Sequence, residues 1–558
     1  MKKSLLIALL SFLPALMMAE RADYRIIPLP KSVQTDTTQF FALRDGMGIA
    51  YDSSDPAISR NAQFLRQWVE EATGLKLRLT PDDKQAAIRL TLGFPADKKA
   101  KKAKKGQKAP ELTQQQQEAY TITVGKNGIA VAARQHVGLF RAVETLRKAL
   151  PLNANPAALN AVDFPFVEIK DEPRFAYRGV MLDCARHYFP METLKRYIDL
   201  MALHGCNQLH WHLTEDQGWR FEVKSLPRLA REGSVREQTV LGHNTDVYDG
   251  QRYGGYYTQA ECRELVNYAA ERYINIIPEI DLPGHMMGAL HVFPNLGCTG
   301  GPYPVNTRWG VMREVLCAGN PETMTFLKTV LGELCDVFPS KFIHIGGDEC
   351  PKDRWKQCAK CQAKAKELGL KDDGKHSIEN QLQTWINHEM EAFLRERGRD
   401  MIGWDEVLEG GLTEGGIVMS WRGVKGGIEA AKQHHRVIMT PTTYCYIDYY
   451  QLKDHYRQPD AIGGYLPVSK VYSFEPLMPE DLSEEEQQYI LGPQVNLWTE
   501  YVAFPQHVFY MLLPRLDAIS EVQWCRSDQK DFEDFKQRLP RMKQLYDRIG
   551  VNYCRQLE

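Results

Sequence analysis

The feature that most constrains the fold is a series of eight apolar, strand-like runs between residues 172 and 525, separated by segments with helical periodicity. The runs are AYRGVMLD (176–183), CNQLHWHL (206–213), INIIPEID (274–281), FIHIGGDE (342–349), DMIGWDE (400–406), GIVMSW (416–421), RVIMTP (436–441) and QVNLWTE (494–500). In the intervening segments apolar residues recur at i, i+3, i+4 and i+7, as they do from Leu194 to Met201. Eight strands alternating with helices predict a (β/α)8 barrel over residues 171–525.

The residues before the barrel have a different texture. Residues 20–170 combine strand-like runs, such as AIRLTLGF (87–94) and YTITVGKNGIAVAAR (120–134), with helical segments at 58–72 and 136–149. The Lys-Asn-Gly sequence inside the second run is typical of a β-hairpin turn. The pattern predicts a smaller α+β companion domain at the N-terminal side, and residues 526–558 are expected to form a helical segment that packs on the barrel.

Residues 97–119 are poor in apolar residues and rich in Lys and Gln, which is typical of a mobile, solvated insertion. A nucleic-acid-binding tail is the alternative, but no aromatic residues are interleaved with these lysines. The whole chain holds 69 Lys and Arg against 71 Asp and Glu. This balance favours no nucleic-acid partner.

The first residues, MKKSLLIALLSFLPALMMAER, have the pattern of a secretory signal peptide. Two lysines precede an apolar run, and Ala19 is a small residue that suits cleavage. A membrane anchor is the alternative, but Ser11 and Pro14 interrupt the run and it is short for a bilayer span. We expect residues 1–19 to be removed and the protein to be exported to the periplasm, the medium or the cell surface, without a transmembrane segment.

Twelve cysteines in an exported chain permit disulfides without requiring them. The best candidates are Cys298 and Cys317, which flank a loop rich in Gly and Pro that a crosslink would restrain. Cys350, Cys358 and Cys361 are a pattern that can indicate zinc, but no second pair and no His follows at finger spacing. We therefore expect a Cys298–Cys317 disulfide and no metal.

Polar or aromatic residues stand at the ends of most of the eight runs. They are Asp183, His212, Asp281 with His285, Asp348 with Glu349, Trp404, Trp421, and Trp498 with Glu500. In a parallel barrel the carboxyl ends of the strands meet on one face, where the chemistry collects. Trp and Tyr rings supply flat apolar faces while the charged groups supply hydrogen bonds, a combination that suits a carbohydrate. Each Trp alone is equally consistent with core packing.

The adjacent acids Asp348 and Glu349 raise a question of mechanism. Cleavage of a glycosidic bond needs a proton donor and a group that stabilises positive charge at the anomeric carbon. A neighbouring anion raises the pKa of a carboxylic acid, so an Asp–Glu pair can keep one member protonated. Because consecutive strand residues point to opposite sides, these two acids are poorly placed to flank one bond in the usual way. We expect them to divide the work differently.

Eight motifs resemble, in order, those of family 20 glycoside hydrolases, the β-N-acetylhexosaminidases. They are RGVMLDCARHYFP (178–190), LHWHLTEDQGWR (209–220), PEIDLPGH (278–285), HIGGDE (344–349), GWDE (403–406), MSWRG (419–423), YIDYY (446–450) and LWTE (497–500). The likeness covers about residues 170–525, and the N-terminal module resembles that family's companion domain. It implies an exo-acting enzyme without a cofactor that releases terminal GlcNAc or GalNAc from glycans. In the retaining mechanism that it implies, the acetamido group of the substrate attacks the anomeric carbon and forms an oxazolinium ion.

The resemblance also assigns roles to individual residues. Glu349 would be the general acid and then the base, Asp348 would hold the acetamido N–H, and Tyr446 would hydrogen-bond the acetamido carbonyl. The other implied roles are hydroxyl binding by Arg186 and Glu500, aromatic walls from Trp404, Trp421 and Trp498, a pocket ligand at Asp448, and a polar network behind the acid at His212, Asp281 and His285. Arg178 would be structural.

One position departs from the family pattern. After HLT the family commonly has Asp-Asp, whereas this chain has Glu215-Asp216, so the supporting carboxylate is one methylene longer. Glu215 is expected either to reach the network through another rotamer or to rearrange it. Two other functions are consistent with the motifs, namely a hexosaminidase that cuts internal bonds and an inactive glycan-binding barrel.

Overall fold

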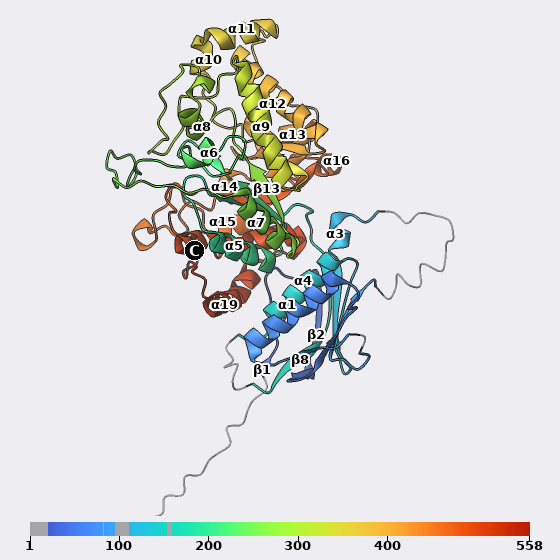
Figure 1. Ribbon diagram of the computed structural model, residues 1–558. Coiled ribbons are helices and arrows are strands. Elements are labelled where there is room, and N and C mark those ends of the chain that lie inside the picture. The colour runs from blue at the N-terminus through green and yellow to red at the C-terminus, as the bar shows by residue number, and fades with distance from the viewer. Residues whose placement is uncertain (1–19, 82, 95–110, 153–158) are drawn as a thin grey trace, which may run out of the picture. The chain divides into compact units, whose positions relative to one another are not determined.

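The computed structural model describes residues 20–81, 83–94, 111–152 and 159–558 (Figure 1). The described chain divides into two units, one ending at Asp171 and the other beginning at Glu172, with residues 27–29 belonging to the second. The predicted signal peptide and residues 97–110 of the predicted insertion lie outside the described residues. Residues 111–119 of that insertion contain the short helix α3 (Gln114–Gln117).

The first unit is a mixed sheet with helices, as the sequence predicts. Its strands run in the order β1 (Glu20–Arg21), β8 (Ala161–Asp171), β6 (Tyr120–Gly125), β7 (Gly128–Ala133), β5 (Ile88–Leu92), β3 (Gly48–Ala50) and β4 (Arg78–Leu79), and β2 (Ser32–Arg44) also pairs with β8. Helices α1 (Pro56–Thr73) and α4 (His136–Ala149) lie side by side, with α4 against β6 and β7 (Figure 1). Gly128 follows the hairpin turn at φ +114°, where a Cβ would meet the carbonyl oxygen of Ala87.

The second unit contains a closed barrel of eight parallel strands. In barrel order the strands are β9 (Gly179–Asp183), β10 (Gln208–His212), β13 (Asn275–Glu279), β14 (Phe342–His344), β15 (Asp400–Trp404), β16 (Ile417–Ser420), β17 (Val437–Met439) and β18 (Ile490–Leu497), which returns to β9. Every one of the eight predicted runs supplies one strand. The (β/α)8 prediction is therefore confirmed.

Helices cover the outside of the barrel. They include α5 (Met191–Leu203), α7 (Gln259–Ala270), α9 (Pro321–Val337), α12 (Ile378–Glu396), α13 (Lys425–Lys432), α17 (Pro505–Leu512) and α18 (Arg515–Trp524). Of these, α5, α7, α9 and α12 contact one another in succession (Figure 1). Their starts are encoded locally, since Thr258, Asn320 and Ser377 cap α7, α9 and α12 through side-chain oxygens.

The remaining elements before the last helix lie in the connections between the strands and these helices, or after α18. They are β11 (Thr214–Glu215), β12 (Gly218–Trp219), α6 (Arg228–Arg231), α8 (Met287–Val292), η2 (Pro294–Leu296), α10 (Asp353–Gln357), α11 (Ala359–Glu367), η3 (Asp405–Leu408), α14 (Thr442–Cys445), η4 (His455–Arg457), α15 (Val468–Tyr472), α16 (Glu484–Gln487) and η5 (Ser527–Gln529). Several of them carry residues of the site described below.

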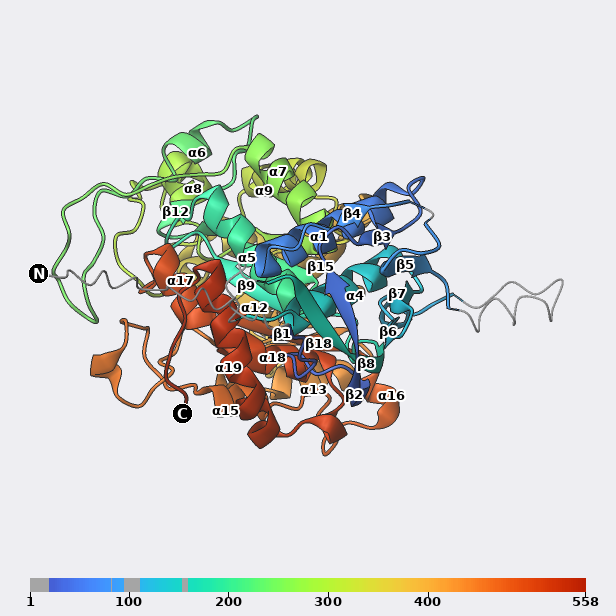
Figure 2. The same ribbon diagram turned by 90° about the horizontal axis from the view of Figure 1, so that it is seen from below.

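The last helix, α19 (Phe532–Ile549), packs beside α18 (Figure 2). The hydroxyl of Tyr546 donates to the carboxylate of Asp517 at 2.7 Å, and Arg538 forms a buried ion pair with Glu521. In the described part of the chain, no helix combines the length and apolarity needed to cross a bilayer.

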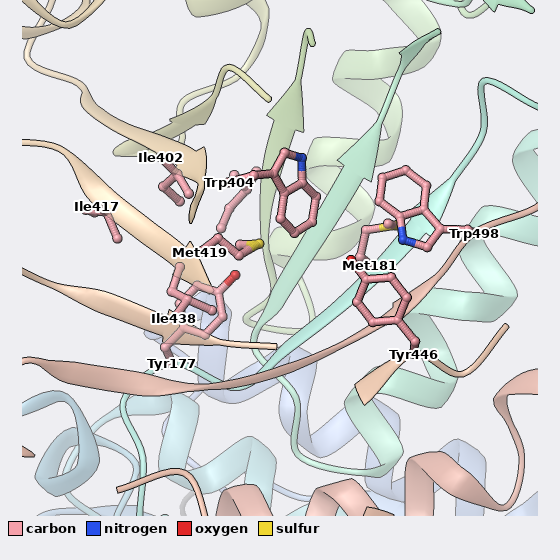
Figure 3. Packing of buried hydrophobic residues seen from close by; sticks show 10 residues of the cluster. Tyr177, Met181, Ile402, Trp404, Ile417, Met419, Ile438, Tyr446 and Trp498 are labelled. Atoms are coloured by element: carbon pink, nitrogen blue, oxygen red, sulfur yellow. The ribbon is translucent and has the colours of Figure 1, made fainter. Parts of the chain in front are cut away.

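The barrel interior is a packed apolar core that supports the carboxyl ends of the strands. Met181, Ile277, Ile402, Ile417, Met419 and Ile438 are fully buried there. Trp404, Tyr446 and Trp498 belong to the same buried cluster (Figure 3). The aromatic residues that the sequence places at strand ends thus stand on a rigid base.

Candidate active site

Side chains from the carboxyl ends of the strands surround one cavity of about 450 Å³. Among the residues predicted from the sequence, the cavity is lined by Arg186, Asp348, Glu349, Trp421, Tyr446, Asp448, Trp498 and Glu500. His212, Glu215, Asp281 and His285 lie behind this lining, where they contact it or one another through the hydrogen bonds described below. The structure therefore brings the predicted residues to one end of the barrel.

The two adjacent acids stand on a loop and not on a strand, which differs from the sequence expectation. Strand β14 ends at His344, and the backbone then takes positive φ at Gly346 (+65°), Gly347 (+99°) and Glu349 (+46°). The strict alternation of strand side chains therefore does not apply to Asp348 and Glu349. Asp348 is 8% exposed, whereas the side chain of Glu349 is 39% exposed.

Asp281 explains why this loop needs glycine. The backbone N–H of Gly347 donates to Oδ1 of Asp281 at 3.0 Å, and a Cβ at Gly346 would lie 1.9 Å from the same oxygen. Asp281 also hydrogen-bonds Asp348. Burial, followed by the charge of Asp348, raises the pKa of Asp281 well above its usual range. Burial also raises the pKa of Asp348, whereas the hydrogen bond with Asp281 lowers it.

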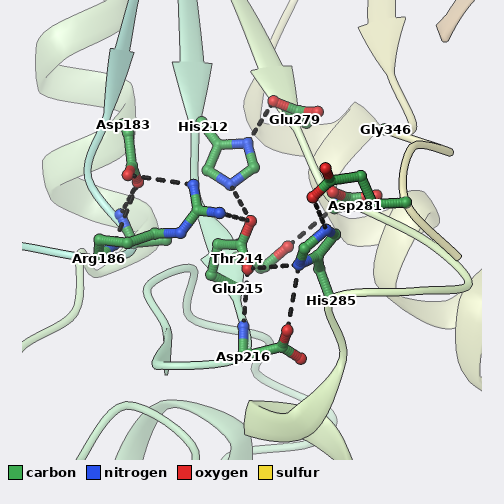
Figure 4. Close-up of polar contacts among 12 residues, drawn as sticks. Asp183, Arg186, His212, Thr214, Glu215, Asp216, Glu279, Asp281, His285 and Gly346 are labelled. Atoms are coloured by element: carbon green, nitrogen blue, oxygen red, sulfur yellow. Dashed lines mark hydrogen bonds and ion pairs between the residues drawn. The ribbon is translucent and has the colours of Figure 1, made fainter. Parts of the chain in front are cut away.

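His285 connects Glu349 to two supporting carboxylates. Its Nε2 atom lies 3.5 Å from Oε2 of Glu349. Its Nδ1 atom lies 2.9 Å from Oε2 of Glu215 and 3.1 Å from Oδ2 of Asp216 (Figure 4). Burial lowers the pKa of His285, but the charge of Glu215 and hydrogen bonds to both carboxylates outweigh it and raise that pKa well above 6.5. A protonated His285 therefore faces Glu349.

Glu215 is the centre of the polar network. Besides His285 it binds Arg186, whose Nη2 lies 2.7 Å from Oε1, and it lies 3.4 Å from Nε2 of His212 (Figure 4). Burial raises the pKa of Glu215, but Arg186 and then His285 lower it well below its usual value. Glu215 thus contacts both Arg186 and His285, and Asp216 supplies a second partner for His285.

Arg186 is held by several anions. Asp183 accepts from its Nη1 at 3.3 Å, Glu500 lies 4.0 Å from its Nη2, and its guanidinium lies 4.8 Å from the ring centroid of Trp498. Asp448, at 2% exposure, and Glu500 complete this end of the cavity. Burial, and then the charge of Glu500, raises the pKa of Asp448 well above its usual range. This end of the cavity is rich in hydrogen-bonding groups.

The acid at Glu279 was not predicted, although it organises the interior of the barrel. It accepts hydrogen bonds from Nδ1 of His212 and from Nε1 of Trp404 at 2.9 Å. Its Oε1 also lies 3.0 Å from Nδ1 of His344, which itself accepts from the N–H of Gly346. His210 also lies 2.9 Å from Glu279. The sequence did contain a sign of this cluster, because three neighbouring apolar runs each hold a His or a Glu. Such a side chain is costly to bury without a partner.

The aromatic residues fall into two groups. Trp421, Tyr446 and Trp498 line the cavity, and Trp421 stacks on Tyr446 with ring centroids 6.0 Å apart. Burial raises the pKa of the Tyr446 hydroxyl well above its usual value, so it remains a donor. Trp404 was predicted to be a wall, but it is 1% exposed and is not among the lining residues. It lies behind Trp498, with ring centroids 5.8 Å apart, and donates to Glu279.

A second set of residues missed in the sequence holds Trp421. Its indole Nε1 donates to Oε2 of Glu406 at 2.9 Å, and its backbone N–H donates to Asp405 at 3.0 Å. Arg422 binds Asp405 at 2.5 Å from its Nε. Burial, then the charges of Asp348 and Asp405, raises the pKa of Glu406 to about 8. The GWDE and MSWRG motifs contain these residues, but only the fold shows that they contact each other.

Apart from Thr442, which begins α14, the remaining lining residues come from loops. They are His243, Asn244, Trp309, Gly310, Val311, Thr442, Tyr449, Ile462 and Tyr501. Arg178 is buried beneath the barrel, where its guanidinium donates to the carbonyl oxygens of Phe175 and Gly205. It is structural, as the resemblance implies.

The predicted disulfide is absent from the structure. Cys298 and Cys317 are both free thiols, although their side chains belong to one cluster with Cys358 and Cys361. The prediction considered the loop that the two cysteines enclose, but it did not anticipate that Cys358, 41 positions after Cys317, lies in the same place.

Family models match both units of the chain. The model described as glycosyl hydrolase family 20, catalytic domain, matches residues 175–527, and the model described as glycosyl hydrolase family 20, domain 2, matches residues 23–172. A β-hexosaminidase of Porphyromonas gingivalis is 38% identical over 531 residues, which are 95% of this chain and 64% of that protein. The chain thus spans slightly less than two thirds of this relative.

Solved structures of similar proteins cover nearly the whole chain. A Streptomyces plicatus β-hexosaminidase mutant in complex with its product GlcNAc has a TM-score of 0.77 at 29% identity, covering 95% of this chain and 96% of that one. A Vibrio harveyi family 20 exo-β-N-acetylglucosaminidase in complex with N-acetylglucosamine has a TM-score of 0.80 at 30% identity, covering 96% and 79%. Because the catalytic-domain model matches more than half of the 558 residues, this chain belongs to glycosyl hydrolase family 20.

Proposed function

We propose that the protein is an exo-acting β-N-acetylhexosaminidase that removes terminal GlcNAc or GalNAc from glycans with retention of configuration. The main observation in support of the proposal is that two adjacent acids differ in burial and in their hydrogen-bonding partners. Asp348 is buried and hydrogen-bonded to Asp281, whereas the carboxyl of Glu349 is open to the cavity and backed by His285. Two carboxyls that act as acid and nucleophile would instead both face the substrate, about 5–5.5 Å apart on either side of the bond.

In this proposal Glu349 donates a proton to the glycosidic oxygen as the bond to the anomeric carbon breaks. The carbonyl oxygen of the substrate's own acetamido group attacks the anomeric carbon and forms an oxazolinium ion. Asp348 accepts a hydrogen bond from the acetamido N–H and offsets the positive charge. The hydroxyl of Tyr446 donates to the acetamido carbonyl. Glu349 then removes a proton from water, which attacks the same carbon and restores its configuration.

The size of the cavity and its polar lining support exo action. Arg186, Asp448 and Glu500 supply hydrogen-bonding groups there, and Trp498 lies against Arg186. A volume of about 450 Å³ is near the lower end of the range for ligand pockets, so it suits one sugar ring better than an internal segment of a polymer. The printed names of the relatives, β-hexosaminidase and exo-β-N-acetylglucosaminidase, are consistent with this substrate class.

The test compares two variants on two substrates. Glu349→Gln removes the proton donor, so turnover of a GlcNAc oligosaccharide should fall about 10²–10⁴-fold. The loss on p-nitrophenyl N-acetylglucosaminide should be smaller because nitrophenolate leaves without a proton. Asp348→Asn should lose activity on both substrates. Near-normal turnover of the oligosaccharide by Glu349→Gln would overturn the assignment.

Two further measurements address the finer points of the proposal. Wild-type enzyme should hydrolyse 2-acetamido glycosides and leave the matching 2-hydroxy glycosides intact, because only the former carry the attacking group. A chitin oligomer should yield monosaccharide from the start, whereas larger early products would indicate cleavage of internal bonds. The signal-like residues 1–19 also support a proposal of export, which N-terminal sequencing of the mature protein would test.

A further inference from the structure

Four cysteine side chains from two separate loops meet at one point outside the cavity. The Sγ atom of Cys361 lies 3.8 Å from that of Cys298 and 3.6 Å from that of Cys317. The Sγ atoms of Cys317 and Cys358 are 3.7 Å apart. All four sulfurs lie within 4.8 Å of one another.

The backbone around each pair of cysteines is well defined. Cys298 and Cys317 lie on paired segments, since Gly297 forms a bridge with Leu316 and the N–H of Cys317 donates to Leu296 at 2.7 Å. Cys358 is the residue before α11, and Cys361 lies in the first turn of that helix. One pair of ligands thus comes from a paired loop and the other from a C-x2-C sequence at a helix start. This is a common arrangement for structural zinc.

The distances distinguish between the ways in which four cysteines can be used. Zn–S bonds of about 2.3 Å in a regular tetrahedron place neighbouring sulfurs about 3.8 Å apart. The three measured separations, 3.6, 3.7 and 3.8 Å, agree with that value. A disulfide would bring two sulfurs to about 2.05 Å and separate them from the other pair.

We propose that Cys298, Cys317, Cys358 and Cys361 bind one structural zinc ion. A ligand set of four thiolates without carboxylate or imidazole favours zinc over Mg²⁺ or Ca²⁺, which prefer oxygen ligands. Cys317 and Cys361 are 1% and 0% exposed, so the ion is shielded from solvent on that side. The proposal is independent of the reaction at the cavity.

Gly319 provides the outer support that metal thiolates require. Its backbone N–H hydrogen-bonds the sulfurs of Cys317 and Cys361. A Cβ at this position would lie 2.1 Å from the backbone carbonyl of Lys360, so only glycine allows the two segments to approach this closely. Amide hydrogen bonds to the sulfurs stabilise thiolates and fix their orientation.

The zinc ion would join two loops that carry active-site residues. Cys298 and Cys317 lie on the connection that leaves β13 and carries Asp281 and His285. Cys358 and Cys361 follow β14, Asp348 and Glu349. Around the cluster the two connections also meet through Nε1 of Trp355, which donates to the carbonyl oxygen of Leu316 at 2.9 Å. We therefore expect the metal to stabilise the second unit and not to take part in the chemistry.

The test measures metal content in the full chain after expression in zinc-supplemented medium. Elemental analysis should give about one zinc per chain, and a mercurial reagent that blocks thiols should release it. Replacement by Co²⁺ should produce the absorption bands of tetrahedral thiolate-bound cobalt. The Cys358→Ser/Cys361→Ser variant should lose zinc and melt at a lower temperature. Cys335→Ser alters a buried cysteine of α9 and should keep both the metal and the melting temperature.

Several results would overturn the proposal. One is a zinc content near zero in wild-type protein together with a mass lower by four hydrogens and peptide maps that show two disulfides. Another is stoichiometric iron in place of zinc, with the colour of an iron–thiolate site. If the double-serine variant fails to fold, the metal content of the wild-type protein still decides, because it is measured independently of the variant. Wild-type protein that contains no metal would overturn the proposal.

Discussion

Arg186 and Glu215 form a buried ion pair, with Nη2 of the arginine 2.7 Å from Oε1 of the glutamate. The second oxygen of Glu215 lies 2.9 Å from Nδ1 of His285. One carboxylate therefore connects the residue proposed to bind sugar hydroxyls with the residue that faces Glu349. A shorter Asp side chain at this position cannot span the same two distances without movement of one partner.

The Glu215→Gln variant tests this connection. Loss of the negative charge removes the interaction that holds the pKa of His285 above its usual value, so less His285 is protonated at neutral pH. We expect kcat/KM to fall on the order of 10–100-fold, as is typical of outer partners of reactive groups. We also expect the kcat/KM profile to shift along the pH axis, because His285 beside Glu349 loses its proton at lower pH than in wild type. The measurement is kcat/KM for a 2-acetamido glycoside between pH 4 and 9.

Glu215→Asp is the matched control because it keeps the charge and shortens the side chain by one methylene. The Asp variant should keep the pH profile close to that of wild type while KM rises, since His285 retains an anion and Arg186 is less firmly held. If the Gln variant showed an unchanged pH profile, Glu215 would have only a structural role.

Gly346 and Gly347 provide a second matched pair. Both have positive φ, so Ala at either position is strained by about 1–3 kcal/mol. Only at Gly346 would the new Cβ collide with Asp281, at 1.9 Å from Oδ1, because the nearest atom to a Cβ at Gly347 is 3.6 Å away. Gly346→Ala should therefore lower both the melting temperature and kcat more than Gly347→Ala does. Equal effects of the two substitutions would show that the Asp281 contact is unimportant.

The barrel could be predicted because its strands are short, apolar and regularly spaced. Buried parallel strands such as β16 and β17 read as nearly continuous apolar runs, and eight strand-like runs leave few alternative folds. The loop after β14 could not be predicted in the same way. Its apolar residues continue the strand pattern as far as Ile345, and the need for glycine at position 346 comes from Asp281, which follows a different strand.

Site residues were predicted when a motif in the local sequence marks them. They were missed when their role depends on partners from distant segments. Motif positions such as Arg186, Tyr446 and Glu500 line the cavity as the resemblance implies. Glu279 was overlooked because its need for a partner becomes clear only when β10 and β14 flank it. The cysteines show the same limit, since Cys317 and Cys358 are 41 positions apart in sequence but 3.7 Å apart in the structure.

Glu406 gives a prediction about stability and pH. Its side chain is 9% exposed, and its pKa is raised from 4.5 to about 8 by burial and by Asp348 and Asp405. At pH values below 4.5 the group is protonated in both the folded and the unfolded chain. As the pH rises toward 8, the unfolded chain releases this proton while the folded chain retains it, so the free energy of unfolding decreases.

Glu406→Gln removes this penalty and preserves an acceptor for the indole N–H of Trp421. The variant should match wild type near pH 4.5 and become more stable than wild type as the pH approaches 8, after which the difference levels off. At about 1.4 kcal/mol per pKa unit, the gain is on the order of a few kcal/mol. Melting temperatures of both proteins from pH 4 to 9 would check this. A difference that stays constant with pH would contradict it.

The same Asp→Asn substitution should lower kcat much less at Asp281 than at Asp348. If Asp281 is protonated, Asn is nearly isosteric with it, accepting from Gly347 through Oδ1 and donating to Asp348 through Nδ2. Asp281→Asn should therefore keep kcat within about 10-fold of wild type. Asp348→Asn loses the negative charge that offsets the oxazolinium ion and should lower kcat on the order of 10²–10³-fold. Steady-state kinetics on an aryl 2-acetamido glycoside separates the two, because neither acid protonates the leaving group. Equal large losses would mean that Asp281 is ionised and that the proton on this pair resides elsewhere.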